Sequence, residues 1–82
     1  MLDDANLTRA NLFQADLTAA NLTNAKLPSA DLSQADLTAA ELTRADLQYA
    51  NLYDAKLTYA QLDGVNFCNT TMPDGSINNT NC

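Results

Sequence analysis

Several residue types are scarce or missing in this chain of 82 residues, and each absence narrows what the protein can do. Histidine does not occur, so neither a serine–histidine nor a cysteine–histidine pair is present to activate a nucleophile. Glycine occurs only twice, which leaves no glycine-rich loop to hold a phosphate group. We therefore expect a protein that is not an enzyme and that holds no cofactor.

Positive charge is also scarce in this sequence. Four basic residues stand against ten acidic ones, which gives a net charge of −6 at pH 7. A domain that contacts nucleic acid needs a basic footprint, so we expect no direct nucleic-acid binding. No apolar run approaches the length of about 20 residues that a membrane-spanning helix needs, so we expect no membrane insertion.

The localisation stays open. We recognise no secretory signal within the chain, because a charged stretch followed by an apolar one is missing. The cytoplasm is compatible with the sequence. The periplasm is also compatible if a targeting segment has been removed.

Only two cysteines occur, Cys68 and Cys82. Two cysteines without histidine offer too few ligands of the usual kinds for a zinc site, so we expect no metal. For the pair itself two interpretations stay open: a disulfide that staples the C-terminal segment, or two free thiols in a reducing compartment. In the chain-entropy model, a disulfide that closes a loop of about fifteen residues contributes about 3 kcal/mol.

Alanine and leucine, by contrast, recur with a period of five residues along almost the whole chain. The stretch QADLTAA at residues 14–20 occurs again at 34–40, and eleven of fourteen positions match between 14–27 and 34–47. The repeating unit is alanine, a polar residue, leucine and two further residues. We expect its central apolar residues to form the core: Leu7, Leu12, Leu17, Leu22, Leu27, Leu32, Leu37, Leu42, Leu47, Leu52, Leu57, Leu62, Phe67, Met72 and Ile77.

A five-residue period fits neither an α-helix nor a flat strand. In a helix, successive leucines would advance by about 140° and spread around the whole cylinder. In a strand, alanine and leucine share a face, but the next alanine would fall on the opposite face. A chain that turns a corner once per unit satisfies the pattern, because both residues then point inward on every short side. The duplication at a lag of twenty favours four sides per coil.

The run ANLTRANLFQADLTAANLTNAKL, residues 5–27, and its continuation resemble the pentapeptide-repeat proteins. The unit of that family is alanine, aspartate or asparagine, leucine and two variable residues. The resemblance covers almost the whole chain. It implies an all-β fold, a right-handed quadrilateral parallel β-helix (solenoid) with about four coils of four pentapeptides. We expect the asparagine or aspartate before each leucine to bond to nearby backbone at the corners.

We expect a single pentapeptide-repeat domain over residues 1–82. Residues 1–66 are regular repeats, and residues 67–82 form a degenerate C-terminal coil or cap, in which we expect the five-residue register to persist to the last residue. Pro73-Asp74-Gly75 is a turn signal. This tail resembles the ending of pentapeptide-repeat proteins from cyanobacteria, including some associated with the thylakoid lumen. The resemblance therefore adds the thylakoid lumen to the possible localisations if a targeting segment has been removed. Because the first coil begins without a cap, we also expect end-to-end association into a homo-oligomer.

The function follows less directly from the sequence. We expect a structural or protein-interaction module with an unknown protein partner. Several aromatic residues stand at outward positions. We expect Tyr49 and Tyr53 to flank one corner, and we prefer this pair as the contact patch. The candidate interaction surface consists of Phe13, Tyr49, Tyr53 and Tyr59.

Two other functions stay open as alternatives. Some members of the family resemble an acidic rod of DNA-like width and bind DNA gyrase, so mimicry of DNA toward such a DNA-handling protein is the first. Ice binding is the second, because Thr18, Thr38 and Thr58 recur at a lag of twenty and would form a row. A cross-strand threonine ladder without that function explains the same row.

Overall fold

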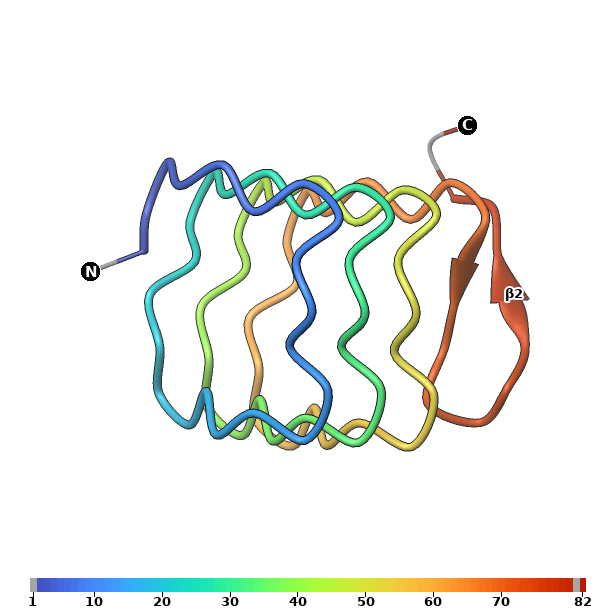
Figure 1. The fold of residues 1–82 in the computed structure, drawn as a ribbon. Coiled ribbons are helices and arrows are strands. Elements are labelled where there is room, and N and C mark those ends of the chain that lie inside the picture. Colours follow the sequence, from blue (N-terminus) through green and yellow to red (C-terminus); the bar gives the residue numbers. More distant parts are fainter. Residues whose placement is uncertain (1, 81) are drawn as a thin grey trace.

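The chain winds into a short parallel β-helix in the computed structural model, which describes residues 2–80 and 82 (Figure 1). Isolated parallel bridges join residues twenty apart, from Asn6 with Lys26 to Asn51 with Thr71. Each coil therefore takes four pentapeptides, which confirms the expectation drawn from the duplication. The molecule measures 27 × 22 × 21 Å along its principal axes. Within the described part no helix forms that is long and apolar enough to cross a membrane.

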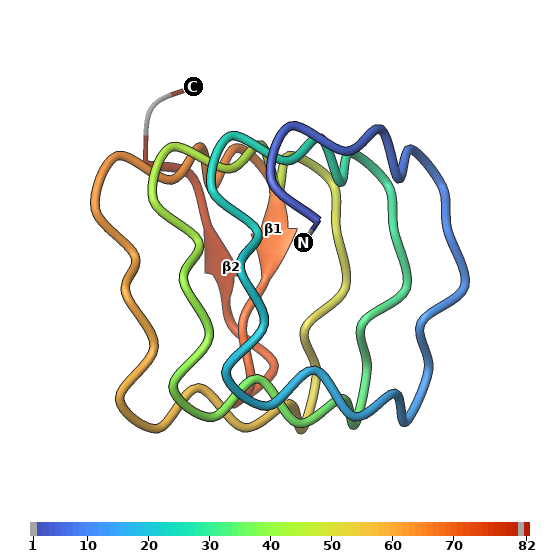
Figure 2. The same ribbon diagram turned by 90° about the vertical axis from the view of Figure 1, so that its left-hand side faces the viewer.

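Tight turns separate the short sides of the coil, whose successive turns lie next to one another in Figure 2. The alanine after each corner donates its N–H to the leucine three residues earlier, as Ala35 does to Leu32 at 3.0 Å. The second corner residue has a positive φ, for example 59° at Gln34 and 60° at Ala39. A positive φ at this one position is typical of a type II turn, and it costs a residue with a side chain about 1–2 kcal/mol.

Hydrogen bonds between coils compensate for this strain. The N–H of Leu32 donates to Asn51 at 2.8 Å, and the N–H of Gln34 donates to Tyr53 at 2.9 Å. Toward the preceding coil, the N–H of Asp31 donates to the carbonyl of Ala10 at 2.9 Å. Every regular pentapeptide in the middle of the molecule repeats this set, so the neighbouring coils contribute to holding each corner.

The core is the interior of the coil. Leucines from Leu22 to Leu52 are fully buried at 0% exposure, and the inward alanines from Ala25 to Ala50 are at most 1% exposed. The central residues nearer the two ends are less enclosed, because no further coil covers them. Those that are only partly buried are Leu2, Leu7, Leu12, Leu17, Leu57, Leu62 and Met72.

The C-terminal segment leaves the regular register at residues 74–75. Asp74 stands at the second corner position but lacks the positive φ, which falls instead on Gly75 at 87°. The N–H of Gly75 still donates to Met72 at 2.9 Å, yet the chain then runs back on itself. A turn followed by a left-handed glycine is the three-residue hairpin loop that reverses a strand.

The reversal pairs β1 (Thr70–Thr71) with β2 (Ile77–Asn78) in an antiparallel hairpin, drawn in orange and red in Figure 1. The expectation that the register persists to the last residue is therefore wrong. Ile77, predicted to lie in the core, is 55% exposed, because β2 pairs with Thr71 and no longer stacks on the coil beneath.

Candidate interaction surface

Most of the asparagine and aspartate residues before the leucines are engaged in the corners. Asp36 accepts the N–H of Thr38 at 3.0 Å and the hydroxyl of Thr38 at 2.5 Å, both on Oδ1. The same pair of bonds recurs at Asp16 and Asp31, which also precede a leucine, and at Asp74 in the C-terminal turn. These bonds confirm the expected role of such residues as turn formers.

The same bonds set the electrostatics of the walls. The hydrogen bonds from the hydroxyl and the N–H two residues on hold the pKa of these four carboxyls below the ordinary value of 3.8. The four groups are therefore ionised at neutral pH. They contribute fixed negative charge to the outer walls rather than proton transfer.

Neither a pocket nor a metal-ligand cluster is found in the described part of the molecule. No cavity opens among residues 2–80 and 82. No group of three or more cysteine, aspartate or glutamate side chains gathers there as metal ligands would. Leucine and alanine fill the interior, so the residues that vary from one pentapeptide to the next all lie on the outside.

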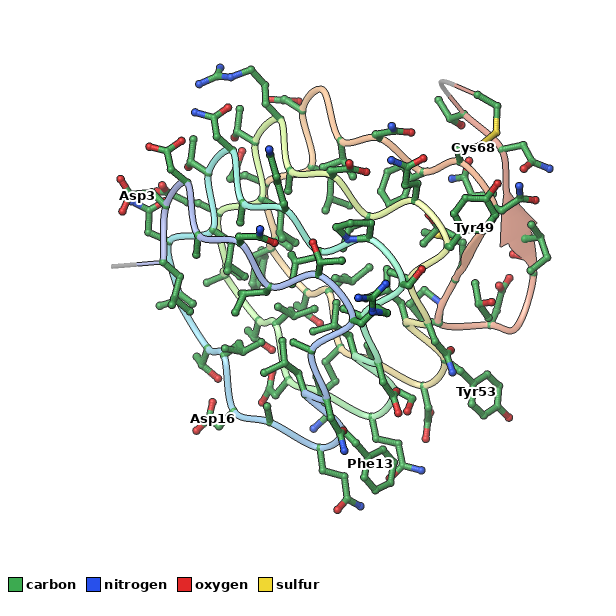
Figure 3. All side chains as sticks on the ribbon, turned by 45° about the horizontal axis from the view of Figure 1, so that its top comes forward. Asp3, Phe13, Asp16, Tyr49, Tyr53 and Cys68 are labelled. Carbon is green, nitrogen blue, oxygen red and sulfur yellow. A yellow bond between two sulfur atoms is a disulfide. The ribbon has the colours of Figure 1, made fainter. Side chains whose placement is uncertain are left out.

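Tyr49 and Tyr53 lie on two successive corners, on either side of the wall that contains Asn51. Tyr49 belongs to the turn closed by the bond from Ala50 to Leu47, and Tyr53 to the turn that starts at the next leucine. The expectation that the two residues flank a single corner is therefore wrong. Their side chains are 59% and 53% exposed, and both point outward near the hairpin (Figure 3).

The other two candidate residues lie elsewhere. Phe13, 47% exposed, stands at the same corner as Tyr53 but two coils away, because each coil takes twenty residues. Tyr59, 82% exposed, stands at the corner after the next wall. The structure thus brings Tyr49 and Tyr53 together with the hairpin, and it leaves Phe13 and Tyr59 apart from them.

Ile77 belongs to this surface, although its place in the repeat predicts a core residue. It is the cross-strand partner of Thr71. Thr71 in turn pairs with Asn51 of the preceding coil, on the same wall. Gly75 lies under Tyr53, since a Cβ added there would be 3.6 Å from Cε1 of the ring. We call Tyr49, Tyr53, Thr71 and Ile77 the tyrosine face. The turn signal at residues 73–75 was the one local indication that the register ends there.

A disulfide in the structure joins Cys68 and Cys82 and closes the C-terminal segment onto the coil. Two hydrogen bonds lie beside it. The N–H of Phe67 donates to Thr80 at 3.2 Å, and the N–H of Asn69 donates to Oδ1 of Asn79 at 3.0 Å. The hairpin is thus held at its turn by Gly75 and at its open end by the disulfide.

Residues 2–74 match a known family of repeats. The model described as "Pentapeptide repeats" matches in eight copies over residues 2–38, 15–48 and 35–74. The chain belongs to the pentapeptide repeat family. No curated protein matches it.

Several solved structures are similar to this pentapeptide repeat protein, among them the following two. One is a pentapeptide repeat protein from Nostoc Pcc 7120, which is 43% identical with a TM-score of 0.57; the match covers 79% of this chain and 58% of that one. The other is Rfr23 from the cyanobacterium Cyanothece 51142, which is 35% identical with a TM-score of 0.51, over 73% of this chain and 54% of that one. This chain therefore spans a little more than half the length of these relatives.

Proposed function

We propose that this pentapeptide repeat protein is a non-enzymatic module that binds another protein through its outer walls. We infer further that the coil is right-handed and makes about four turns of four pentapeptides, the last of them closed by the hairpin. The bridges at a separation of twenty residues support this count per coil. The interior is filled with leucine and alanine, so the outer walls are the part of the molecule that can recognise a partner.

The observation that carries the proposal is the exposure of Tyr49 and Tyr53. Packing a tyrosine ring against a partner removes apolar surface from water, which is favourable. More than half of each of these two residues is exposed to solvent. Tyrosine is enriched in protein interfaces because a rigid ring supplies contact area at little entropic cost. Both rings project from corners that are held by hydrogen bonds to adjacent coils, so the surface is prearranged for a partner.

The two alternatives gain no support from the geometry. B-DNA carries about sixteen phosphate charges over 27 Å, whereas this molecule, 27 Å long, has a net charge of −6. The hydroxyls of Thr18 and Thr38, expected to face ice, donate instead to the carboxylates of Asp16 and Asp36 at 2.7 and 2.5 Å. A protein partner is therefore the best-supported class of ligand.

A capture experiment tests this function. The immobilised protein is exposed to an extract of the source organism, in parallel with the double variant Tyr49→Ala/Tyr53→Ala and the control Tyr59→Ala. We expect the wild type and the control to recover the same protein and the double variant to lose it. Thermal unfolding of all three proteins first verifies that they are equally folded. Equal recovery by the double variant would rule out the proposed surface.

We also propose that the N-terminal end associates with a second copy. Leu7, Leu12 and Leu17 are only partly buried there, and no coil pairs with the outer edge of the first coil among the described residues. An unpaired edge with an apolar centre favours association. Sedimentation at increasing concentration should show dimers, and Leu12→Lys should shift them to monomers. A monomer at every concentration would contradict this proposal.

A further inference from the structure

The tyrosine face, on which the proposed function rests, has a definite chemistry. Thr71 donates its N–H to Ala50 at 3.0 Å and accepts the N–H of Leu52 at 2.8 Å, so it continues the wall as a regular strand residue. Thr70 beside it is fully buried, which places Thr71 on the outer side, because neighbouring residues of a strand alternate. Ile77, directly opposite Thr71, therefore projects outward between the two tyrosines' corners.

Negative charge accompanies the aromatic rings on this side of the molecule. Asp54 follows Tyr53 on the corner, and Asp74 lies in the turn stacked on it, where the N–H of Asp54 donates to Pro73 at 2.9 Å. Both carboxylates are exposed. Oδ1 of Asp74 accepts the N–H and the hydroxyl of Ser76, at 3.0 and 2.6 Å, which leaves the second oxygen of this carboxylate for a ligand.

The basic residues all lie elsewhere. The pairing at a lag of twenty places Lys26 and Lys56 on the two neighbouring walls, and Arg44 at a corner on the far side. Arg9 shares the column of Tyr49 but stands two coils away, near the N-terminal end. The tyrosine face therefore combines aromatic rings and an aliphatic side chain with the carboxylates of Asp54 and Asp74, while Lys56, two residues after Asp54, lies on the neighbouring wall where it pairs with the strand residue Asp36.

We propose that the tyrosine face docks a segment of a protein partner that carries arginine. The guanidinium plane stacks on the ring of Tyr53 and pairs with the carboxylates of Asp54 and Asp74, while the aliphatic part of the segment covers Ile77. A ring face attracts a cation, and a planar guanidinium can stack and pair with a carboxylate at the same time. Lysine, a compact and strongly hydrated charge, satisfies this arrangement less well.

The size of the face sets the expected strength of binding. One wall of a molecule that measures 27 × 22 × 21 Å offers less than the roughly 800 Å² per partner that a standard interface buries. The contact is therefore weak and exchanges rapidly. It also weakens with salt, because its charges are open to solvent. Nuclear magnetic resonance is suited to such a contact.

The experiment is a titration of the ¹⁵N-labelled whole protein, with its disulfide intact, with a short peptide of arginine, glycine and serine. The probe is compared with the same peptide in which citrulline replaces arginine, and with its lysine counterpart. We expect amide shifts that centre on Tyr49, Tyr53, Thr71 and Ile77 with the arginine peptide. We expect smaller shifts with the lysine peptide and none with the citrulline peptide.

Matched variants separate the contributions. Tyr53→Leu keeps an apolar side chain over Gly75 but removes the ring, and Asp54→Asn/Asp74→Asn removes the charges; we expect each to weaken binding several-fold. The controls Tyr59→Leu and Asp63→Asn change the same residue types at other corners, and we expect them to bind like the wild type. The amide spectrum of the buried leucines verifies that every variant is folded.

Two results would overturn the inference. One is a set of shifts spread evenly over all acidic corners, which indicates only counterion binding. The other is a failure of a matched comparison, that is, unchanged binding by the Tyr53→Leu variant or by the citrulline peptide. If the peptide fails but a captured partner still requires Tyr49 and Tyr53, the arginine inference is wrong and the proposed function stands. If capture is also independent of both tyrosines, both proposals are wrong.

Discussion

Each interior leucine lies between two apolar central residues that are twenty residues away along the chain. Leu32, for example, belongs to the column that also contains Leu12 and Leu52, and it is fully buried. The alanines on either side are small because two inward residues share every short side. At this scale the fold depends on a regular alternation of one large and one small side chain, which leaves no space for substitution.

Truncation of an interior leucine should therefore be costly. We expect Leu32→Ala to lower the free energy of unfolding by about 2–5 kcal/mol, because it removes buried contacts and leaves a cavity. Denaturant unfolding at one temperature measures the change. The control is Leu12→Ala, at a partly buried position of the same column, and it should cost clearly less. Equal losses at the two positions would contradict the burial gradient.

The carboxylates at the corners should make stability depend on pH. The pKa of Asp36 is lowered in the folded protein, chiefly by the hydroxyl of Thr38, below its ordinary value of 3.8. A group with a depressed folded pKa stabilises the fold above its unfolded pKa and loses that effect as the pH falls through the folded value. We therefore expect the urea midpoint to decrease below about pH 4.

The variant Asp36→Asn provides the control for this pH dependence. Its amide oxygen can still accept the two bonds from Thr38, but the group cannot titrate in this range. The urea midpoint of the variant should change less with pH than that of the wild type. A steeper dependence, or the same one, would show that Asp36 does not contribute.

At the scale of elements, one backbone dihedral angle decides between a corner and a hairpin. At the regular corners the left-handed residue is the third of the four turn residues, as Gln34 is in the turn at residues 32–35, and the coil continues. At residues 72–75 the left-handed residue is the fourth, Gly75, and the chain reverses. The position of a single glycine thus ends the parallel pairing and creates β1 and β2.

Substitution of this glycine should loosen the hairpin. We expect Gly75→Ala to destabilise it by about 1–2 kcal/mol, because the φ of 87° disfavours a side chain. Space is not the cause, since the added Cβ would be in ordinary contact with Tyr53 at 3.6 Å. Amide exchange measures the effect at the N–H of Met72, which donates to Ser76 across the hairpin at 2.7 Å.

Asparagine at the same position is the matched comparison. It tolerates left-handed backbone better than alanine does, so Gly75→Asn should recover part of the protection at Met72. Faster exchange in both variants to the same extent would indicate that the left-handed conformation is not the reason for the loss. Exchange at the interior corners should be unchanged in either case.

At the scale of the whole molecule, the two ends are the least enclosed parts. The C-terminal end is covered in part by the hairpin, which the disulfide between Cys68 and Cys82 holds in place. We propose that this bond exists in solution. The chain-entropy model then gives a contribution of about 3 kcal/mol for a loop of this length, so reduction should lower the melting temperature.

Two measurements check this proposal. The intact mass should rise by about two hydrogens on reduction, because a disulfide takes up two protons with two electrons. The variant Cys68→Ser/Cys82→Ser should melt like the reduced wild type and should not respond to reductant. Two thiols that can be alkylated in the native, unreduced protein would show that the bond is not formed.

The coil and its core could be predicted from the sequence because both depend on local repetition. A period of five excludes a helix and a flat strand, and the duplication at a lag of twenty sets four sides per coil. Each inward position then follows from its place in the repeat. The repeat predicts the wrong position for Ile77. The turn before it has its left-handed residue at Gly75, and the five-residue period carries no information about that dihedral angle.

The arrangement of the outer surface was decided only by the tertiary structure. The sequence shows that Tyr49 and Tyr53 point outward, but their places on successive corners depend on where each turn closes. Ile77 reaches the same wall because the hairpin lets β2 pair with β1 instead of with the coil beneath. Repetition determines the interior, where every unit meets an equivalent unit. The surface depends on contacts between unlike segments, and these exist only once the chain has folded.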